Sequence, residues 1–241
     1  YFALNTSRGF FKDPKARQAV AYAVNRPAIT RLAGLNAGTP NEQILPPGIP
    51  GFRNAPVYPL DRPNVEKAKA LLGGRTAKVV MYTTNDPLGI NTGQMLQANL
   101  KAIGIDVQVK PLTFAVLIDK SGTRGEPVDI TSIGWFADYP DPYDFINILL
   151  DGRTIAAKNN VNVSYFDNPT YQKRMDSAAK LAGDARYRAY GTLDIDITRN
   201  QSPLVITNNQ NVREFISSKI GCPTYSFAWG GLNLVMLCPK R

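Results

Sequence analysis

The sequence predicts an α/β fold, and three observations support that prediction. A strand-like run, Lys78–Thr83, a helix-like run, Asn91–Ile103, and a second strand-like run, Ile105–Val109, follow one another in the order of a β-α-β unit. Helix-like runs with one apolar side occur before and after that unit. A further apolar run, Val128–Gly134, leads directly into a loop of aromatic and acidic residues, Trp135–Asp144. In α/β proteins, ligands usually bind just beyond the ends of strands.

The chain begins with a predicted strand, Tyr1–Asn5, followed by two helices. Asp13 and Pro14 are residue types favoured at the N-cap and the first turn of a helix. An apolar stripe at helical spacing then predicts one buried face, formed by Ala16, Ala19, Val20, Ala23 and Val24. A second, short helix is predicted from Arg26 to about Leu32.

Residues 34–63 differ in composition from the rest of the chain, because prolines recur throughout them. Proline disrupts helix interiors and central strands, so this segment is predicted to be a long irregular excursion. Excursions of that length inside a domain are often functional. The segment leads into a predicted helix, Val65–Leu72, which Gly73 and Gly74 end.

The second half alternates helices and strands around the Trp135–Asp144 loop. Pro140 and Pro142 fix the backbone φ angle and stiffen that loop, so its carboxylates are expected to be held in place. A surface turn in which an aspartate caps the next helix is the alternative. The other predicted elements are helices at Phe114–Lys120, Phe145–Leu150, Pro169–Ala182 and Ala185–Asn200, a strand at Pro203–Thr207, and irregular strands from Asn211 onward.

Composition is typical of a globular protein with a substantial core. The 241 residues are 44% hydrophobic and 20% charged, and no apolar run approaches the roughly 20 residues of a membrane span. The net charge is +9, but lysine and arginine are scattered along the chain, so no nucleic-acid partner is predicted. Tyr1–Asn5 has neither an initiator methionine nor the features of a signal peptide. We therefore expect a mature or internal piece of a longer protein.

The residue types present exclude several kinds of catalytic site. The chain has no histidine, no phosphate-binding P-loop motif and no dinucleotide-binding glycine motif, so no catalytic residue and no cofactor is predicted. Asp138 and Asp141 could form the carboxylate pair of a glycosidase. Asp138, Asp141 and Asp144 could attract calcium, but Pro140 and Pro142 interrupt the spacing of a calcium-binding loop, so no metal is predicted. A structural or partner-binding module is a further alternative.

Two cysteines, Cys222 and Cys238, lie in the C-terminal tail, and fifteen residues separate them. That spacing does not fit a redox C-x-x-C motif, and zinc is disfavoured without histidine. An even number of cysteines in a non-cytosolic chain favours a disulfide. Two buried free thiols are the alternative.

Several segments together resemble the oligopeptide- and dipeptide-binding family of extracytoplasmic solute-binding proteins that serve ABC importers. Phe11–Arg26 is similar to the run F-x-D-x-x-V-R-x-A-x-x-x-A-I-D-R of that family, with Ala16 and Asn25 as mild departures. Gly134–Pro142 is similar to its G-W-x-A-D-Y-x-D-P segment. Weaker similarities are the Leu45–Gly48 turn and the Val65–Leu72 helix.

The resemblance implies a periplasmic-binding-protein-like (type II) C-terminal lobe, with a mixed sheet flanked by helices. Residues 1–210 would form this lobe, and residues 211–241 would be a return segment that crosses to a missing N-terminal lobe. The implied partners are a peptide or other small solute and the permease subunits of an ABC importer at the membrane. The implied location is extracytoplasmic, either periplasmic or as a cell-surface lipoprotein.

The resemblance also implies a role for the acidic loop. Asp138 corresponds to the aspartate that pairs with the free α-amino group of a bound peptide. Trp135, Phe136 and Tyr139 would line the ligand pocket, although Trp135 could instead serve core packing. Cargo in this family also includes nickel chelates, haem, opines and oligosaccharides, and the sequence leaves these alternatives open.

Overall fold

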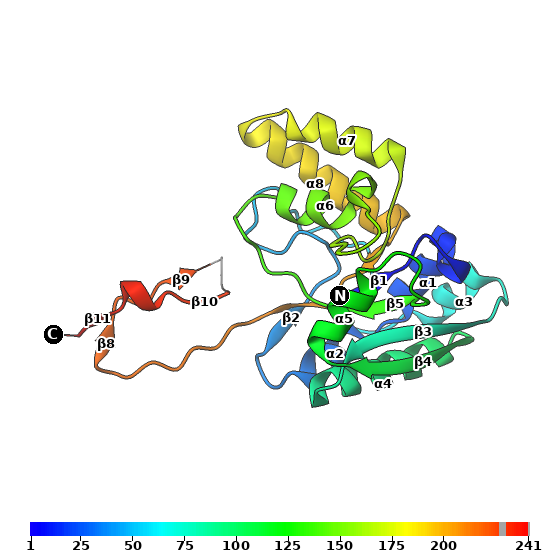
Figure 1. Ribbon diagram of the computed structural model, residues 1–241, viewed down its shortest axis with the longest axis horizontal. Coiled ribbons are helices and arrows are strands. Elements are labelled where there is room, and N and C mark those ends of the chain that lie inside the picture. The colour runs from blue at the N-terminus through cyan, green and yellow to red at the C-terminus, as the bar shows by residue number, and fades with distance from the viewer. Residues whose placement is uncertain (227–229, 241) are drawn as a thin grey trace.

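The structure is a computed structural model that describes residues 1–226 and 230–240 (Figure 1). Its α-helices are α1 (Pro14–Ala23), α2 (Arg26–Leu32), α3 (Val65–Leu72), α4 (Pro87–Lys101), α5 (Phe114–Ser121), α6 (Tyr143–Leu150), α7 (Pro169–Ala179) and α8 (Gly183–Asn200). Its strands are β1 (Phe2–Leu4), β2 (Gly38–Pro40), β3 (Ala77–Thr84), β4 (Ile105–Leu112), β5 (Ile130–Ser132), β6 (Leu204–Val205), β7 (Asn208–Gln210), β8 (Ile220–Gly221), β9 (Tyr225–Ser226), β10 (Gly231–Leu232) and β11 (Cys238–Pro239). None of the described helices is both long enough and apolar enough to span a membrane.

A five-stranded sheet in the order β4-β3-β5-β1-β6 organises the body of the molecule. Strand β3 runs parallel to β4 and β5, whereas β1 runs antiparallel to β5 and β6. The sheet is therefore mixed, and the predicted α/β class is confirmed.

Two large hydrophobic cores, with a smaller cluster of Tyr82, Leu117 and Val128, cover the two faces of this sheet. Because side chains alternate along a strand, Phe2 and Leu4 point into one core with residues of α1, α3 and α4, while Ala3 points into the other. The second core contains residues of α6, α7 and α8, which gather on one side of the sheet in Figure 1. Burial on both faces explains why β1 and β6 are apolar, whereas the edge strand β4 begins with alternating buried and exposed residues.

The structure corrects several predicted boundaries. Helix α4 begins at Pro87 rather than Asn91, because Asp86 caps it by accepting a hydrogen bond from the Gly89 backbone nitrogen (3.0 Å). Helix α6 begins at Tyr143 rather than Phe145, and β5 keeps only the middle of the predicted Val128–Gly134 strand. The predicted N-cap at Asp13 is confirmed, since its side chain accepts from the Lys15 nitrogen (2.9 Å).

The proline-rich excursion is less irregular than predicted. It contains β2, which pairs antiparallel with β7, a strand about 170 residues later in the chain. This pairing depends on residues far apart in the sequence, so the local strand propensity of residues 38–40 does not predict it. The pairing attaches the excursion to the end of the β6–β7 segment, next to the site described below.

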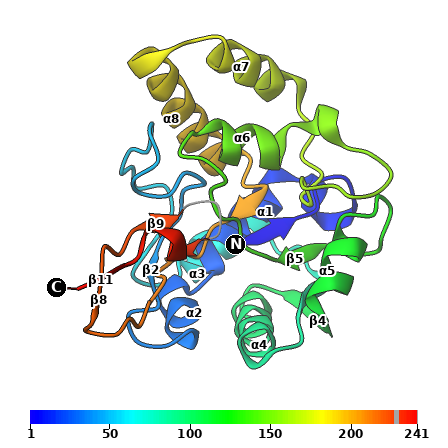
Figure 2. The same ribbon diagram turned by 60° about the vertical axis from the view of Figure 1, so that its left-hand side comes forward.

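The tail from residue 211 leaves the body past β2 and then turns back toward it (Figures 1 and 2), so that Tyr225 lines the cavity described below. It contains two small antiparallel pairs, β8 with β11 and β9 with β10, in agreement with the predicted irregular strands. A disulfide joins Cys222 to Cys238 with their Cα atoms 5.5 Å apart, which confirms the predicted pairing. Residues 227–229 and 241, which the predicted tail also includes, lie outside the described residues.

Candidate functional site

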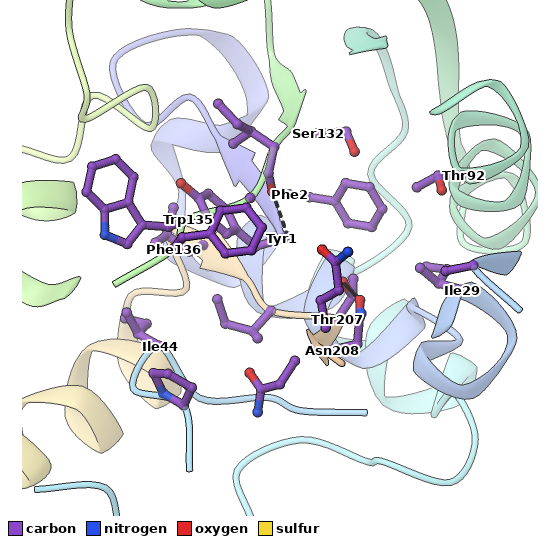
Figure 3. Close-up of a pocket in the computed structure, with 18 of the residues that line it drawn as sticks. Tyr1, Phe2, Ile29, Ile44, Thr92, Ser132, Trp135, Phe136, Thr207 and Asn208 are labelled. Atoms are coloured by element: carbon purple, nitrogen blue, oxygen red, sulfur yellow. Dashed lines mark hydrogen bonds between the residues drawn. The ribbon is translucent and has the colours of Figure 1, made fainter. Parts of the chain in front are cut away.

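A cavity of about 650 Å³ opens at the carboxyl ends of the parallel strands (Figure 3). Thr84 at the end of β3, Ser132 at the end of β5 and Ile206 just after β6 all line it. Tyr1 joins them from the beginning of the antiparallel strand β1. Ligands usually bind open α/β sheets at this position. The loop predicted to follow a strand, Trp135–Asp144, contributes Trp135 and Phe136 to the cavity.

The cavity has an apolar wall and a neutral polar wall. The apolar side chains come from several helices and the proline-rich segment: Ile29, Ile44, Ile49, Phe114, Leu117, Phe145 and Leu149. The polar ones are mostly hydroxyl and amide groups: Thr92, Ser132, Thr207, Asn208, Asn209 and Gln210. Asp86 carries the one charged side chain of this lining among the described residues. A hydrogen bond with the Thr84 side chain lowers the pKa of Asp86, whose carboxylate also caps α4.

The four predicted ligand residues divide into two groups. Trp135 and Phe136 line the cavity, and Figure 3 shows them beside Tyr1, across from Ile29 and Thr92. Asp138 and Tyr139 lie further along the same loop, are exposed, and are not part of the described lining. The Asp138 carboxylate makes no hydrogen bond or ion pair with any described residue. It is therefore available to a ligand, and its role stays a prediction.

Asp141 and Asp144 hold the loop in place. Asp141 Oδ1 accepts a hydrogen bond from the Tyr143 backbone nitrogen (2.8 Å) at the beginning of α6, and the same carboxylate forms an ion pair with Arg186 of α8 (2.8 Å). Asp144 Oδ2 accepts from the Trp135 indole nitrogen (3.2 Å) and from the Asp138 backbone nitrogen (3.0 Å). Asp141 thus binds the first backbone nitrogen of α6 from the residue before the N-cap, Pro142, and the Asp138 carboxylate is left without a described partner.

Trp135 has two roles at once. Its ring lines the cavity and also packs against the core formed by α6, α7 and α8. Burial against that core fixes the ring, and the hydrogen bond to Asp144 orients its polar edge, as expected for a half-buried tryptophan.

The proline-rich wall of the cavity is held by a buried carboxylate that the sequence analysis did not single out. Asp194 of α8 accepts hydrogen bonds from the Ile44 backbone nitrogen (3.0 Å) and the Gln43 side chain (3.1 Å). Its side chain is fully buried, and that burial raises its pKa to about 7. A lone aspartate on a helix predicts a solvated side chain, so only the tertiary structure identifies this contact.

The raised pKa of Asp194 predicts a pH-dependent stability. The folded state keeps the proton up to about pH 7, whereas the unfolded chain loses it near the ordinary aspartate value, about pH 4. This stabilisation is therefore fully present below about pH 4 and is lost as the pH rises to about 7, by at most roughly 4 kcal/mol. Asp194→Asn should flatten that part of a urea-unfolding profile measured from pH 4 to 8. The exposed Asp184→Asn, on the same helix, should leave it unchanged, and an equal slope in both variants would contradict this account.

Comparison with known proteins identifies the family. Residues 1–157 match the model described as "Bacterial extracellular solute-binding proteins, family 5 Middle". The chain belongs to this family. Family 5 is a family of binding proteins, and membership places the chain outside the cytoplasm. The resemblance inferred from the sequence motifs is thereby confirmed.

Family 5 relatives are distant in sequence and much longer than this chain. Heme-binding protein A of Haemophilus influenzae is 28% identical over 216 residues, which are 85% of this chain and 38% of that protein. Probable di/tripeptide-binding protein 5 of Pseudomonas aeruginosa is 28% identical over 201 residues, 79% of this chain and 36% of that protein. The chain thus spans less than half the length of these curated relatives.

Solved structures confirm the fold. The oligopeptide-binding protein AppA from Bacillus subtilis, in complex with a nonapeptide, superposes with a TM-score of 0.82 at 20% identity, covering 100% of this chain and 50% of that chain. The periplasmic binding protein DppA from Helicobacter pylori, in complex with the peptide STSA, gives a TM-score of 0.76 at 24% identity, covering 86% and 40%. The predicted type II periplasmic-binding-protein architecture is therefore confirmed.

Proposed function

We propose that this chain is part of the substrate-binding component of an ABC importer that captures peptides and delivers them to a membrane permease. The observation that carries the proposal is the cavity at the strand ends, with the Trp135–Asp144 loop on one side, in a chain of family 5. A site lined mostly by neutral side chains, with Asp86 as the charged one among the described lining residues and the exposed Asp138 carboxylate nearby, suits binding rather than bond cleavage.

The ligand would lie between this lobe and an N-terminal lobe of the same protein, and the two would close by a hinge motion. The chain matches only 36–38% of the length of its first curated relatives, which leaves room for a second lobe. The tail 211–241 carries exposed apolar side chains, including Phe215 (95% exposed) and Val235 (90% exposed). We infer that this segment crosses to the N-terminal lobe, which would cover those side chains.

Asp138 would bind the α-amino group of the peptide. A carboxylate without a protein partner can form a short, charge-assisted hydrogen bond to an ammonium group. Trp135 and Phe136 would provide the apolar wall, and Tyr139, which is 42% exposed, would meet the ligand once the second lobe closes. Main-chain hydrogen bonds can hold an extended peptide while roomy pockets accept varied side chains, and the mostly neutral lining fits that mode.

A non-peptide cargo is the second candidate, because one relative at 28% identity is named a heme-binding protein and a structure at 27% identity holds agropinic acid. Nickel chelates and oligosaccharides are further cargo classes for the same mechanism. A glycosidase that uses Asp138 and Asp141 is not supported, since Asp141 is in an ion pair with Arg186 and accepts a hydrogen bond from the Tyr143 backbone nitrogen.

The proposal predicts that binding needs both lobes. The 241-residue chain alone should bind the peptide tri-alanine much more weakly than the complete protein, because about half of the contacts are absent. Isothermal titration of both proteins with tri-alanine measures this difference. Equal affinity for the two would contradict the two-lobe part of the proposal, and no binding by the complete protein would contradict the peptide cargo.

A further inference from the structure

Asp144 is the most buried acidic residue of the Trp135–Asp144 loop, which we call the site loop. Its side chain is 1% exposed, although it lies in the first turn of α6, whereas Asp138 on the same loop is exposed. A single oxygen, Oδ2, accepts both hydrogen bonds of this carboxylate, from the Trp135 indole nitrogen (3.2 Å) and the Asp138 backbone nitrogen (3.0 Å). The other oxygen, Oδ1, is buried and has no hydrogen-bond partner among the described residues.

A carboxylate in this position is costly to the fold. Burial and the like charges of Asp138 and Asp141 raise the pKa of Asp144, so its charged form is disfavoured. Arg186 offsets the charge of Asp141, but no described residue forms an ion pair with Asp144. Helix capping does not require it either, because Asp141 already accepts the Tyr143 backbone nitrogen. The described hydrogen bonds of the Asp144 side chain are therefore those from the Trp135 indole N–H and the Asp138 backbone N–H, and these two contacts explain why a carboxylate is buried here.

Asp144 Oδ2 accepts hydrogen bonds from both Trp135 and Asp138, and so links the aromatic wall of the cavity to the loop backbone at Asp138. One hydrogen bond fixes the edge of the Trp135 ring, which forms part of the cavity wall. The other fixes the backbone from which the Asp138 side chain projects. We propose that Asp144 is the positioning residue of the ligand site: through Oδ2 it sets the distance and orientation between the aromatic wall and the carboxylate that receives the ligand amine. This inference rests on the proposed function of Asp138.

Two substitutions at position 144 separate positioning from mere packing. Asp144→Ala removes the acceptor of both hydrogen bonds. Asp144→Asn keeps a neutral oxygen that can occupy the Oδ2 position and accept from both N–H groups, so it should restore the geometry that alanine loses. Asn147→Ala is the matched control, because Asn147 lies one turn later on α6, is buried, and binds the Tyr190 hydroxyl (2.8 Å) without lining the cavity. It removes a buried hydrogen bond of the same helix and leaves the loop untouched.

The first readout needs no ligand. In the 241-residue chain carrying Trp229→Phe, Trp135 supplies the single indole N–H resonance of a 15N-labelled sample. We expect Asp144→Ala to move that resonance toward the position of a free indole and to speed its exchange with solvent. Asp144→Asn and Asn147→Ala should leave it near the wild-type position. An unchanged indole resonance in Asp144→Ala would overturn the proposal.

The second readout is the affinity of the complete protein for tri-alanine and for N-acetyl-tri-alanine. Asp144→Ala should weaken tri-alanine binding by about tenfold or more, through loss of the two hydrogen bonds that orient the site. The acetylated peptide should be much less affected, and Asp144→Asn should recover most of the loss. If the indole moves but tri-alanine affinity does not change, the positioning role is wrong. If the wild-type protein binds neither peptide, the proposed cargo and the role of Asp144 toward it are both overturned, whereas the indole result is independent of that failure.

Discussion

Asp138→Asn in the complete protein is expected to weaken the binding of tri-alanine by about ten- to a hundredfold, the equivalent of one charge-assisted hydrogen bond. The Asp138 side chain has no described protein partner, so the substitution removes no described contact of the fold. Asparagine keeps the shape of the side chain but loses the negative charge that attracts an ammonium group. Isothermal titration at constant ionic strength measures the change.

N-acetyl-tri-alanine is the ligand control, because it lacks the positive charge and should bind wild type and variant with similar affinity. Asp119→Asn is the protein control, since Asp119 is an exposed aspartate of α5 outside the described cavity lining. If Asp138→Asn weakens both peptides equally, Asp138 does not bind the amine, and the loop must contribute to affinity in another way.

Arg26→Met is expected to destabilise the body strongly, by roughly 3–5 kcal/mol or enough to prevent folding. The Arg26 side chain is 1% exposed, and burial lowers its pKa to about 10. Its guanidinium group donates hydrogen bonds to four backbone carbonyls, of Ala21, Asn41, Pro59 and Ile206. Methionine fills a similar volume but leaves those buried oxygens without a donor, and it removes the positive charge near Glu42.

Arg31→Met on the same helix is the matched control, because Arg31 is exposed and its side chain forms no described hydrogen bond or ion pair. Urea unfolding followed by circular dichroism should show a large loss of stability for the first variant and almost none for the second. Similar stability in both would mean that Arg26 does not hold the proline-rich segment, and that β2–β7 pairing and Asp194 position the cavity wall without it.

Much of the fold was predictable because its signals are local. The stripe from Ala16 to Val24 and the cap at Asp13 predict α1 from adjacent residues, and the structure confirms both. The β-α-β unit was likewise predictable from alternating apolar runs. The Asp86–Pro87 start of α4 follows the same rule as Asp13–Pro14 and could have been recognised from the sequence.

The remaining parts of the site depend on contacts between distant segments. Asn208–Gln210 enter the cavity wall because β7 pairs with β2, and no local pattern indicates that pairing. Arg26 and Asp194 look like ordinary surface charges in the sequence, since burial of a charge is decided by what packs against it. The aromatic and acidic loop was predictable from the sequence. The different contacts of its three aspartates were not, because they depend on the hydrogen bonds and the ion pair that Asp141 and Asp144 form in the folded protein.

Native mass spectrometry of the complete protein, purified without refolding, tests the central claim most directly. We predict a series of small bound masses that correspond to short peptides, and their loss from Asp138→Asn. One sharp non-peptide mass would contradict peptide capture and would show that the protein binds another solute. A spectrum with no bound mass, unchanged on addition of tri-alanine, would contradict a solute-binding role altogether.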